Sequence, residues 1–274
     1  MGKARFLAHY LFTRGRTHRY GPERSQRGDL HLPPGDGPHP VIVLIHGGSW
    51  RKRYGRRVMR ALAADLLARG FAVWNVEYRR VGEPGGGWPA TFADVAAAID
   101  HLEGLSPALD LADVQAIGHS AGGHLALWAA GRDGLPAGAP GAVAGRSRVR
   151  LRRVVSLAGV CDLTGAYAQW HGGAVRELMG GSPERLPDRY AVADPLRRVP
   201  LPIPALLVHG VADETVSVRL SRRYAEAAAG AGGEVELVEI EGPAGEHRAF
   251  IYPGGAAWGA VAERLRPEVP ARAT

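Results

Sequence analysis

Short apolar runs rich in Val, Ile, Leu and Ala alternate along this chain with segments whose apolar residues recur at helical spacing. Continuous runs of this kind are typical of strands buried on both faces of a sheet. Val58, Leu62 and Leu66 show the spacing of a helix. Strands that alternate with helices predict an α/β fold with a mostly parallel central sheet flanked by helices. The predicted buried strands are residues 40–45, 71–78, 114–118, 153–159 and 205–210.

Weaker patterns lie at the two ends of this series. Residues 235–240 alternate apolar and polar positions, and Leu30-His-Leu resembles a short strand, so we expect both near the edges of the sheet. Residues 1–28 are basic and show no periodicity, which predicts an irregular N-terminal arm packed on the domain edge. Because no repeat or second apolar core is present, residues 1–274 are predicted to form a single domain.

Two helix starts carry recognisable capping signals. Thr91 followed by Asp94 predicts a capping box for a helix over residues 92–102. Ser217 is predicted to cap a helix that ends near Ala229, before a glycine.

Residues 160–203 are longer than a plain connection between two parallel strands and carry Tyr167, Trp170, His171 and Tyr190 among glycines and prolines. Insertions of this kind leave a sheet at the end where α/β proteins bind ligands. We therefore predict a small cap insertion over the mouth of a pocket. The alternative is a helical excursion that packs its own aromatic side chains.

Composition and charge narrow the class of protein. The chain is 46% hydrophobic and 22% charged, as expected of a globular protein, and its formal net charge is +7. Basic residues cluster at 14–27, 51–57 and 146–153 without interleaved aromatic residues or a nucleic-acid reading module, so no nucleic-acid partner is expected. We interpret these clusters as solvated surface, with an anionic partner as the alternative.

The cellular location is predicted from the cysteine content and from two missing signals. A single cysteine, Cys161, excludes an intramolecular disulfide and fits a reducing compartment. No apolar run approaches the length of a membrane span, and the first residues lack the apolar core of a secretory signal. A cytoplasmic protein is therefore expected.

The most informative stretch joins the apolar run 114–118 to a segment of helix formers. Between them lies Gly118-His-Ser-Ala-Gly122, a strand-to-helix corner with Ser120 at its tip. Glycines on both sides of such a corner avoid collisions with the strand and the helix. The N–H group of Ala121, which opens the helix, points toward charge that develops on a substrate oxygen. Ser120 is therefore the candidate nucleophile.

A serine that attacks a carbonyl needs a base and a group that orients the base, both from loops at the carboxyl ends of the strands. Asp213 follows the strand 205–210 and is the favoured acid, with Asp162 as its competitor and Glu214 as a neighbour that could substitute. Of the eleven histidines, His247 lies in a polar loop after the last strand and is the candidate base. The histidines that flank Ser120 are too close in sequence to approach it correctly.

The candidate oxyanion-binding loop is His46-Gly-Gly-Ser-Trp50, directly after the strand 40–45. Consecutive glycines allow backbone amides to turn toward a substrate, which predicts Gly48, Ser49 and Ala121 as the donors. His119 and His124 are five residues apart and do not form a helical metal pair, and no phosphate-binding loop is present. Neither a metal nor a cofactor is expected.

Four motifs in this order resemble the α/β-hydrolase superfamily, and most of all its branch of small carboxylesterases, feruloyl-esterase-like proteins and kynurenine formamidases. They are the loop 46–50, the corner 118–122, His209-x-x-x-Asp213 and Gly245-Glu-His247. The resemblance implies Ser120 as nucleophile, His247 as base and Asp213 as the orienting acid. Some relatives have a third glycine where this chain has Ser49, and Trp50 is similar to the residue found in formamidases.

The sequence therefore predicts a serine carboxylesterase that cleaves short-acyl or small aromatic esters through an acyl-enzyme. A kynurenine formamidase or related amide hydrolase is the alternative, and a non-catalytic binding protein on the same fold is a third possibility. The predicted partner is a small-molecule ester or amide substrate. Trp50, Trp170 and His171 are candidate substrate contacts.

Overall fold

A computed structural model of the chain describes residues 15–143 and 149–265. Within these residues eight strands form one sheet in the order β1-β2-β4-β3-β5-β6-β7-β8. Strands β3 to β8 pair in parallel, whereas β1 and β2 run antiparallel and extend the sheet beyond β4. The strands are β1 (Arg16–Arg19), β2 (Arg27–His31), β3 (His39–Ile45), β4 (Ala72–Val76), β5 (Leu109–His119), β6 (Leu151–Leu157), β7 (Ala205–Gly210) and β8 (Val235–Ile240).

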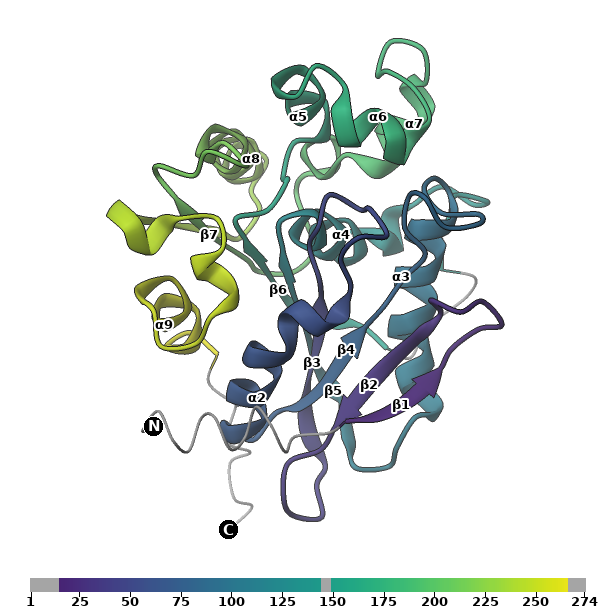
Figure 1. Cartoon of the computed structure of the whole chain (residues 1–274), viewed down its shortest axis with the longest axis vertical. Coiled ribbons are helices and arrows are strands. Elements are labelled where there is room, and N and C mark those ends of the chain that lie inside the picture. Colours follow the sequence, from purple (N-terminus) through teal and green to yellow (C-terminus); the bar gives the residue numbers. More distant parts are fainter. Residues whose placement is uncertain (1–14, 144–148, 266–274) are drawn as a thin grey trace.

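Helices cover both faces of this sheet (Figure 1). On one face pack α3 (Ala90–Asp100), α4 (Ala121–Ala130) and α8 (Val218–Gly230), and on the other α2 (Arg60–Ala68) and α9 (Ala256–Ala262). The side chains of β3 alternate between the two layers of helices. Val41, Val43 and Ile45 face the first layer, and Ile42 and Leu44 face the second. A strand buried on both faces has no polar position, which explains its continuous apolar sequence.

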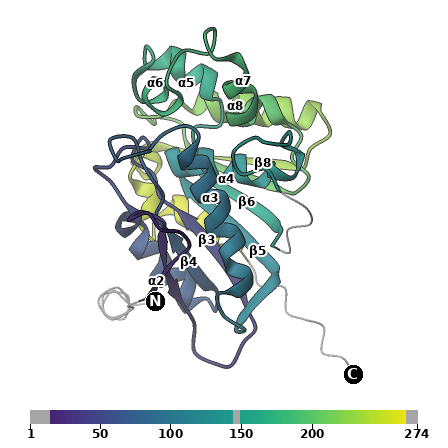
Figure 2. The ribbon, with the colours of Figure 1, turned by 90° about the vertical axis from the view of Figure 1, so that its right-hand side faces the viewer.

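Residues 160–203 leave the sheet between β6 and β7 and fold into three short α-helices and the 3-10 helix Pro195–Arg198 beyond its carboxyl end (Figure 2). Tyr190 is fully buried there and packs edge-on against Tyr167, with ring centroids 6.5 Å apart. The buried carboxylate of Asp194 accepts hydrogen bonds from the N–H groups of Leu163 and Thr164 and so ties the two ends of the segment together. The helices are α5 (Leu163–Gln169), α6 (Gly173–Met179) and α7 (Pro187–Ala193).

Most predicted elements are confirmed, including the bounds of β7 and β8, the edge position of β8 and the cap of α8 by Ser217. The prediction of an irregular arm is wrong for residues 15–28, which contain β1 and the start of β2; residues 1–14 lie outside the described part. Strand β2 is not at the edge, because β1 pairs with it. Short strands with polar side chains carry no apolar alternation, so the sequence pattern could not reveal them.

The predicted capping box at Thr91 and Asp94 is wrong. Helix α3 begins at Ala90 without a side-chain cap, and the Thr91 hydroxyl instead donates to the carbonyl oxygen of Arg79. Asp94 pairs with the Arg79 guanidinium at 2.7 Å. Both side chains therefore hold the loop after β4 rather than the start of their own helix.

The start of α4 lies so close to β3 that a side chain at Gly122 would collide with the backbone. A Cβ there would be 2.1 Å from the carbonyl oxygen of Ile45. We expect Gly122→Ala to lower the free energy of unfolding by about 3 kcal/mol, measured by urea denaturation, because neither backbone can move away cheaply.

Gly230→Ala is the matched control, since Gly230 ends α8 with open space around its Cβ position. This change should leave stability unaltered or raise it by about 0.5 kcal/mol. Equal unfolding midpoints for the two variants would contradict the close contact between α4 and β3.

Candidate active site

Ser120 occupies the corner between β5 and α4 in a backbone conformation that side chains rarely adopt, with φ 56° and ψ −119°. Hydrogen bonds on both sides hold it there. Its N–H donates to the carbonyl oxygen of Leu157 at 2.9 Å, and its carbonyl oxygen accepts from the N–H of His124 at 3.2 Å. The neighbouring strand and the helix therefore compensate for the strain and fix the direction of the side chain.

The Ser120 side chain faces a cavity of about 280 Å³ whose wall comes from three separate loops. Gly47, Gly48 and Ser49 belong to the loop after β3, Thr215 to the loop after β7 and His247 to the loop after β8. Ser120 and His247 thus line the same cavity, although no direct hydrogen bond joins them among the described residues. Catalytic hydrogen bonds are often longer in ligand-free enzymes and shorten when substrate binds.

His247 is held by Asp213, whose Oδ2 accepts a hydrogen bond from the His247 Nδ1–H at 2.7 Å. The other carboxylate oxygen accepts from the N–H groups of Thr215 and Val216 at 2.8 and 3.0 Å. Burial works to raise the pKa of Asp213, but the imidazoles of His209 and His247 and the backbone donors hold it well below its usual range. The group is therefore a carboxylate at neutral pH, and it leaves the His247 Nε2 free to accept a proton.

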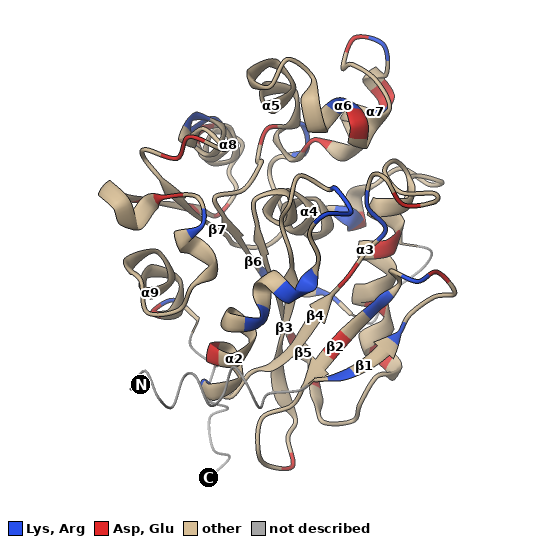
Figure 3. Cartoon of the chain, viewed as in Figure 1, with Lys and Arg blue, Asp and Glu red and all other residues tan. Residues whose placement is uncertain are grey.

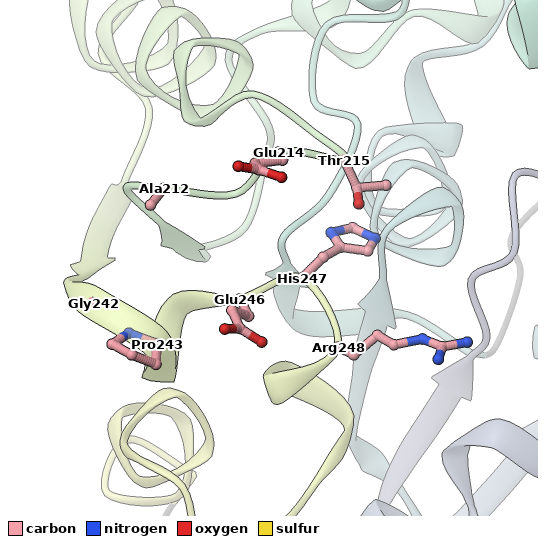
Figure 4. Close-up of a pocket in the computed structure, with 8 residues that line it drawn as sticks. All are labelled: Ala212, Glu214, Thr215, Gly242, Pro243, Glu246, His247 and Arg248. Atoms are coloured by element: carbon pink, nitrogen blue, oxygen red, sulfur yellow. The ribbon is translucent and has the colours of Figure 1, made fainter.

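Figure 4 shows the loops around His247 on its outer side. His247, Thr215 and Arg248 line both the Ser120 cavity and a second, more open hollow. Glu214 and Glu246 line only the outer hollow, and both side chains are exposed. The imidazole therefore stands in the wall between the two spaces.

Asp162, the competing candidate acid, has a different role. Its Oδ1 accepts from the N–H of Gly165 at 2.7 Å and caps α5, and its Oδ2 pairs with Arg223 at 2.5 Å. These contacts account for both oxygens without a contact to His247.

His119, which precedes the serine, holds the loop that carries His247. Its Nε2–H donates to the carbonyl oxygen of His247 at 2.9 Å, and the two rings lie 4.7 Å apart. Burial lowers the pKa of His119 to about 3, and the neighbouring His247 imidazole lowers it further, so the His119 ring is neutral. Sequence reasoning missed this contact, and its signal is a polar residue at the last position of a buried strand.

The loop after β3 turns its backbone through three residues with positive φ: Gly48 at 114°, Ser49 at 53° and Trp50 at 56°. At Gly47 a Cβ would lie 2.7 Å from the His119 carbonyl oxygen, so this loop contacts the backbone beside Ser120. Among the described residues, the N–H groups of Gly48 and Ser49 have no acceptor within the protein. Ala121 opens α4, so its N–H has no acceptor in the helix.

Two side chains that directly follow β4, Glu77 and Tyr78, contact this loop and hold it in place. The His46 Nε2–H donates to Glu77 at 2.6 Å, and the His46 ring stacks on Tyr78 with centroids 4.4 Å apart. The Tyr78 hydroxyl donates to the His46 carbonyl oxygen at 2.9 Å. All three side chains are buried, so the loop is fixed before any ligand arrives.

The three candidate substrate contacts occupy different environments. Trp50 is fully buried and packs edge-on against His124 at 5.3 Å, so it belongs to the core, where no substrate could touch it. Trp170 is partly buried and donates from Nε1 to the carbonyl oxygen of Thr215, a residue of the cavity wall. His171 is exposed. The segment 160–203 therefore contacts the wall through Trp170 rather than lining the Ser120 cavity.

Comparison with known proteins identifies the family. The family described as BD-FAE matches residues 29–227, which include the loop after β3, the corner at Ser120 and Asp213. This chain belongs to the BD-FAE family.

Several relatives resemble this BD-FAE chain over most of its length. It is 28% identical over 241 residues to Esterase LipC of Mycobacterium tuberculosis, a match that covers 80% of this chain and 56% of LipC. Esterase B from Lactobacillus rhamnosis has a TM-score of 0.75 and 22% identity, with 96% of this chain and 89% of that one covered. The propionate-bound Est2 of Thermogutta terrifontis has a TM-score of 0.70 and 25% identity, covering 91% of each chain. The predicted α/β-hydrolase fold is confirmed.

Within the described residues of this BD-FAE chain, no group of three or more His, Cys, Asp or Glu is arranged to hold a metal ion. None of the helices described here is both long and apolar enough to cross a bilayer.

Two buried neutral histidines make stability depend on pH. Burial lowers the pKa of His119 to about 3 and that of His124 to about 4, against an ordinary value of 6.5. As the pH falls below about 6.5, the unfolded chain takes up protons that the folded protein excludes. We expect the free energy of unfolding to fall by up to about 1.4 kcal/mol per pH unit for each histidine, measured by urea denaturation between pH 7.5 and 5.

His124→Asn removes one of these groups, and the slope of stability against pH should decrease by the equivalent of one proton. The conservative change keeps a polar atom near the Ala193 carbonyl oxygen, which the His124 ring contacts at 2.9 Å. An unchanged slope in this variant would contradict the assignment of a neutral buried imidazole.

Proposed function

We propose that this BD-FAE chain is a serine carboxylesterase that cleaves short-acyl or small aromatic esters. The observation that carries the proposal is the Asp213–His247 hydrogen bond of 2.7 Å at the wall of the cavity that Ser120 faces. In this proposal Ser120 is the nucleophile, His247 the general base and Asp213 the group that orients and stabilises the imidazolium.

The reaction proceeds in two halves. The His247 Nε2 takes the proton of the Ser120 hydroxyl as its oxygen attacks the ester carbonyl carbon, and the carbonyl oxygen becomes an oxyanion. Backbone N–H groups of Gly48, Ser49 and Ala121 stabilise that charge. His247 returns the proton to the departing alcohol, which leaves an acyl-enzyme. Water, deprotonated by His247, then attacks the acyl-enzyme, and His247 returns that proton to the departing Ser120 oxygen as the acid is released.

The size of the cavity and the named relatives support an ester with a small acyl group. A volume of about 280 Å³ is at the lower end of small-molecule sites. Est2 of Thermogutta terrifontis is solved with propionate bound, and Esterase B with a tributyrin phosphonate inhibitor. The relative LipC is itself named an esterase. Cys161, a free buried thiol, supports the proposed cytoplasmic location.

A formamidase is the second candidate, favoured by the similarity of the loop 46–50 to that of kynurenine formamidases. It would use the same three side chains on a formyl amide. Turnover of p-nitrophenyl acetate, longer acyl esters and N-formylkynurenine, measured side by side, separates the two activities. Turnover of the formamide alone would replace the esterase proposal.

A fluorophosphonate probe tests the nucleophile directly. We expect the wild-type protein to be labelled on Ser120, and Ser120→Ala to lose the label and at least about 10⁴-fold in kcat. Asp213→Asn should lose about 10⁴-fold, because the imidazole then adopts the wrong tautomer.

Ser106→Ala is the matched control and should keep both label and activity, because Ser106 precedes the amino end of β5 whereas Ser120 follows its carboxyl end. If the wild-type protein takes no label and cleaves none of these substrates, it is a binding protein on this fold rather than an enzyme.

A further inference from the structure

A second cavity, of about 660 Å³, adjoins the one that Ser120 faces. Tyr54 and Val58 line both, so the two spaces share a wall on the segment that leads into α2. Five arginines also line the second cavity, which we call the arginine cavity: Arg24, Arg27, Arg53, Arg56 and Arg57. Figure 3 shows the concentration of basic residues on β1, β2 and the chain before α2.

The charges of this cavity are poorly balanced. Arg56 pairs with Asp29 at 2.8 Å. Glu77 is the acidic residue of the lining, and His46 and Arg80 lie 2.6 and 2.9 Å from its carboxylate. Among the residues that the structure describes, the remaining four arginines have no carboxylate within ion-pairing distance.

Arg27 is partly buried, whereas Arg53 is exposed and contacts an aromatic ring of the cavity wall. The Nε of Arg27 is buried without a hydrogen-bond acceptor among the described residues. The Arg53 guanidinium lies 5.6 Å from the ring of Tyr54, which is part of the wall that the two cavities share. Both side chains therefore line the hollow next to the wall that it shares with the Ser120 cavity.

Arg248 adds an exposed guanidinium to the Ser120 cavity itself. In Figure 4 its side chain extends away from Glu246, and none of the described carboxylates pairs with it. The acidic residues Glu214 and Glu246 line the outer hollow on the other side of His247. Arg248 lines this hollow too, but neither glutamate lines the Ser120 cavity.

We propose that the ester substrate carries an anionic group, a carboxylate or a phosphate, which the arginine cavity binds while Ser120 attacks the ester. Guanidinium groups bind both anions through paired, charge-assisted hydrogen bonds. An anion also relieves the repulsion between several unpaired positive charges around one hollow. This inference rests on the proposed hydrolase function and names the substrate class of that site.

The test compares esters that differ only in charge. 4-Acetoxybenzoate and 4-acetoxybenzamide share the acetyl group and the ring, and 4-acetoxyphenylacetate and its amide extend each by one methylene. In at least one of the two pairs we expect kcat/KM to be about tenfold higher for the carboxylate than for its amide, because a charge-assisted hydrogen bond contributes about that much. This preference should fall as NaCl is raised from 50 to 500 mM. 4-Acetoxyphenyl phosphate shows which anion is preferred.

The variant Arg53→Gln/Arg57→Gln should abolish the preference, mainly through KM, while turnover of the neutral amides stays at the wild-type level. Arg152→Gln removes an exposed arginine at the amino end of β6 and is the matched control, which should keep the preference. Equal kcat/KM for every charged and neutral pair in the wild-type protein would overturn the proposal. So would a preference that survives in the double variant.

Equilibrium binding separates this proposal from the hydrolase function. Calorimetry with 4-hydroxybenzoate and 4-hydroxybenzamide measures charge preference without any reaction. Tighter binding of the carboxylate by the wild-type protein, lost in the double variant, supports the anion site even if the fluorophosphonate probe does not label Ser120. Labelling of Ser120 with equal binding of both compounds would overturn the anion site and leave the hydrolase function standing.

Discussion

The structure depends on how closely the corner at Ser120 packs against its neighbours. A Cβ at Gly118 would lie 2.0 Å from the carbonyl oxygen of Gly122, and one at Gly47 would lie 3.0 Å from the Cβ of Ser120. Only glycine permits these approaches. They bring β5, α4 and the loop after β3 together around one side chain in a strained conformation. Ser120 and the candidate oxyanion donors are therefore placed by backbone contacts that do not depend on a bound ligand.

Buried imidazoles then connect this corner to the rest of the candidate site. His119 joins it to the loop of His247, His209 lies 3.6 Å from Asp213, and His46 joins the loop after β3 to Glu77, which follows β4. All three rings donate a hydrogen bond from Nε2. His119 donates to the carbonyl oxygen of His247, His209 to that of Val216, and His46 to the carboxylate of Glu77. A buried imidazole that lost its partner would have no water to replace it, which costs free energy. These hydrogen bonds therefore fix loops that would otherwise move independently.

The distribution of charge gives the cavity two different sides. Glu214 and Glu246 lie on the outer side of His247, and the unpaired arginines lie beyond Tyr54 on the other. A net charge of +7 describes the whole chain, whereas the local arrangement decides which ligand groups are attracted. The Arg56–Asp29 pair occupies the same region as the arginines that have no carboxylate partner within residues 15–143 and 149–265.

The sequence by itself determined the α/β class, the positions of the buried strands and the candidates Ser120, Asp213 and His247, because apolar runs and strand-end loops follow local rules. It did not reveal β1, the true partners of Thr91 and Asp94, or the contact of His119 with the His247 loop. Nor did it show that Trp50 is buried in the core or that the arginines gather around one cavity. Whether an indole turns into the core, or an arginine finds a carboxylate, depends on segments distant in sequence, and only tertiary packing brings those together.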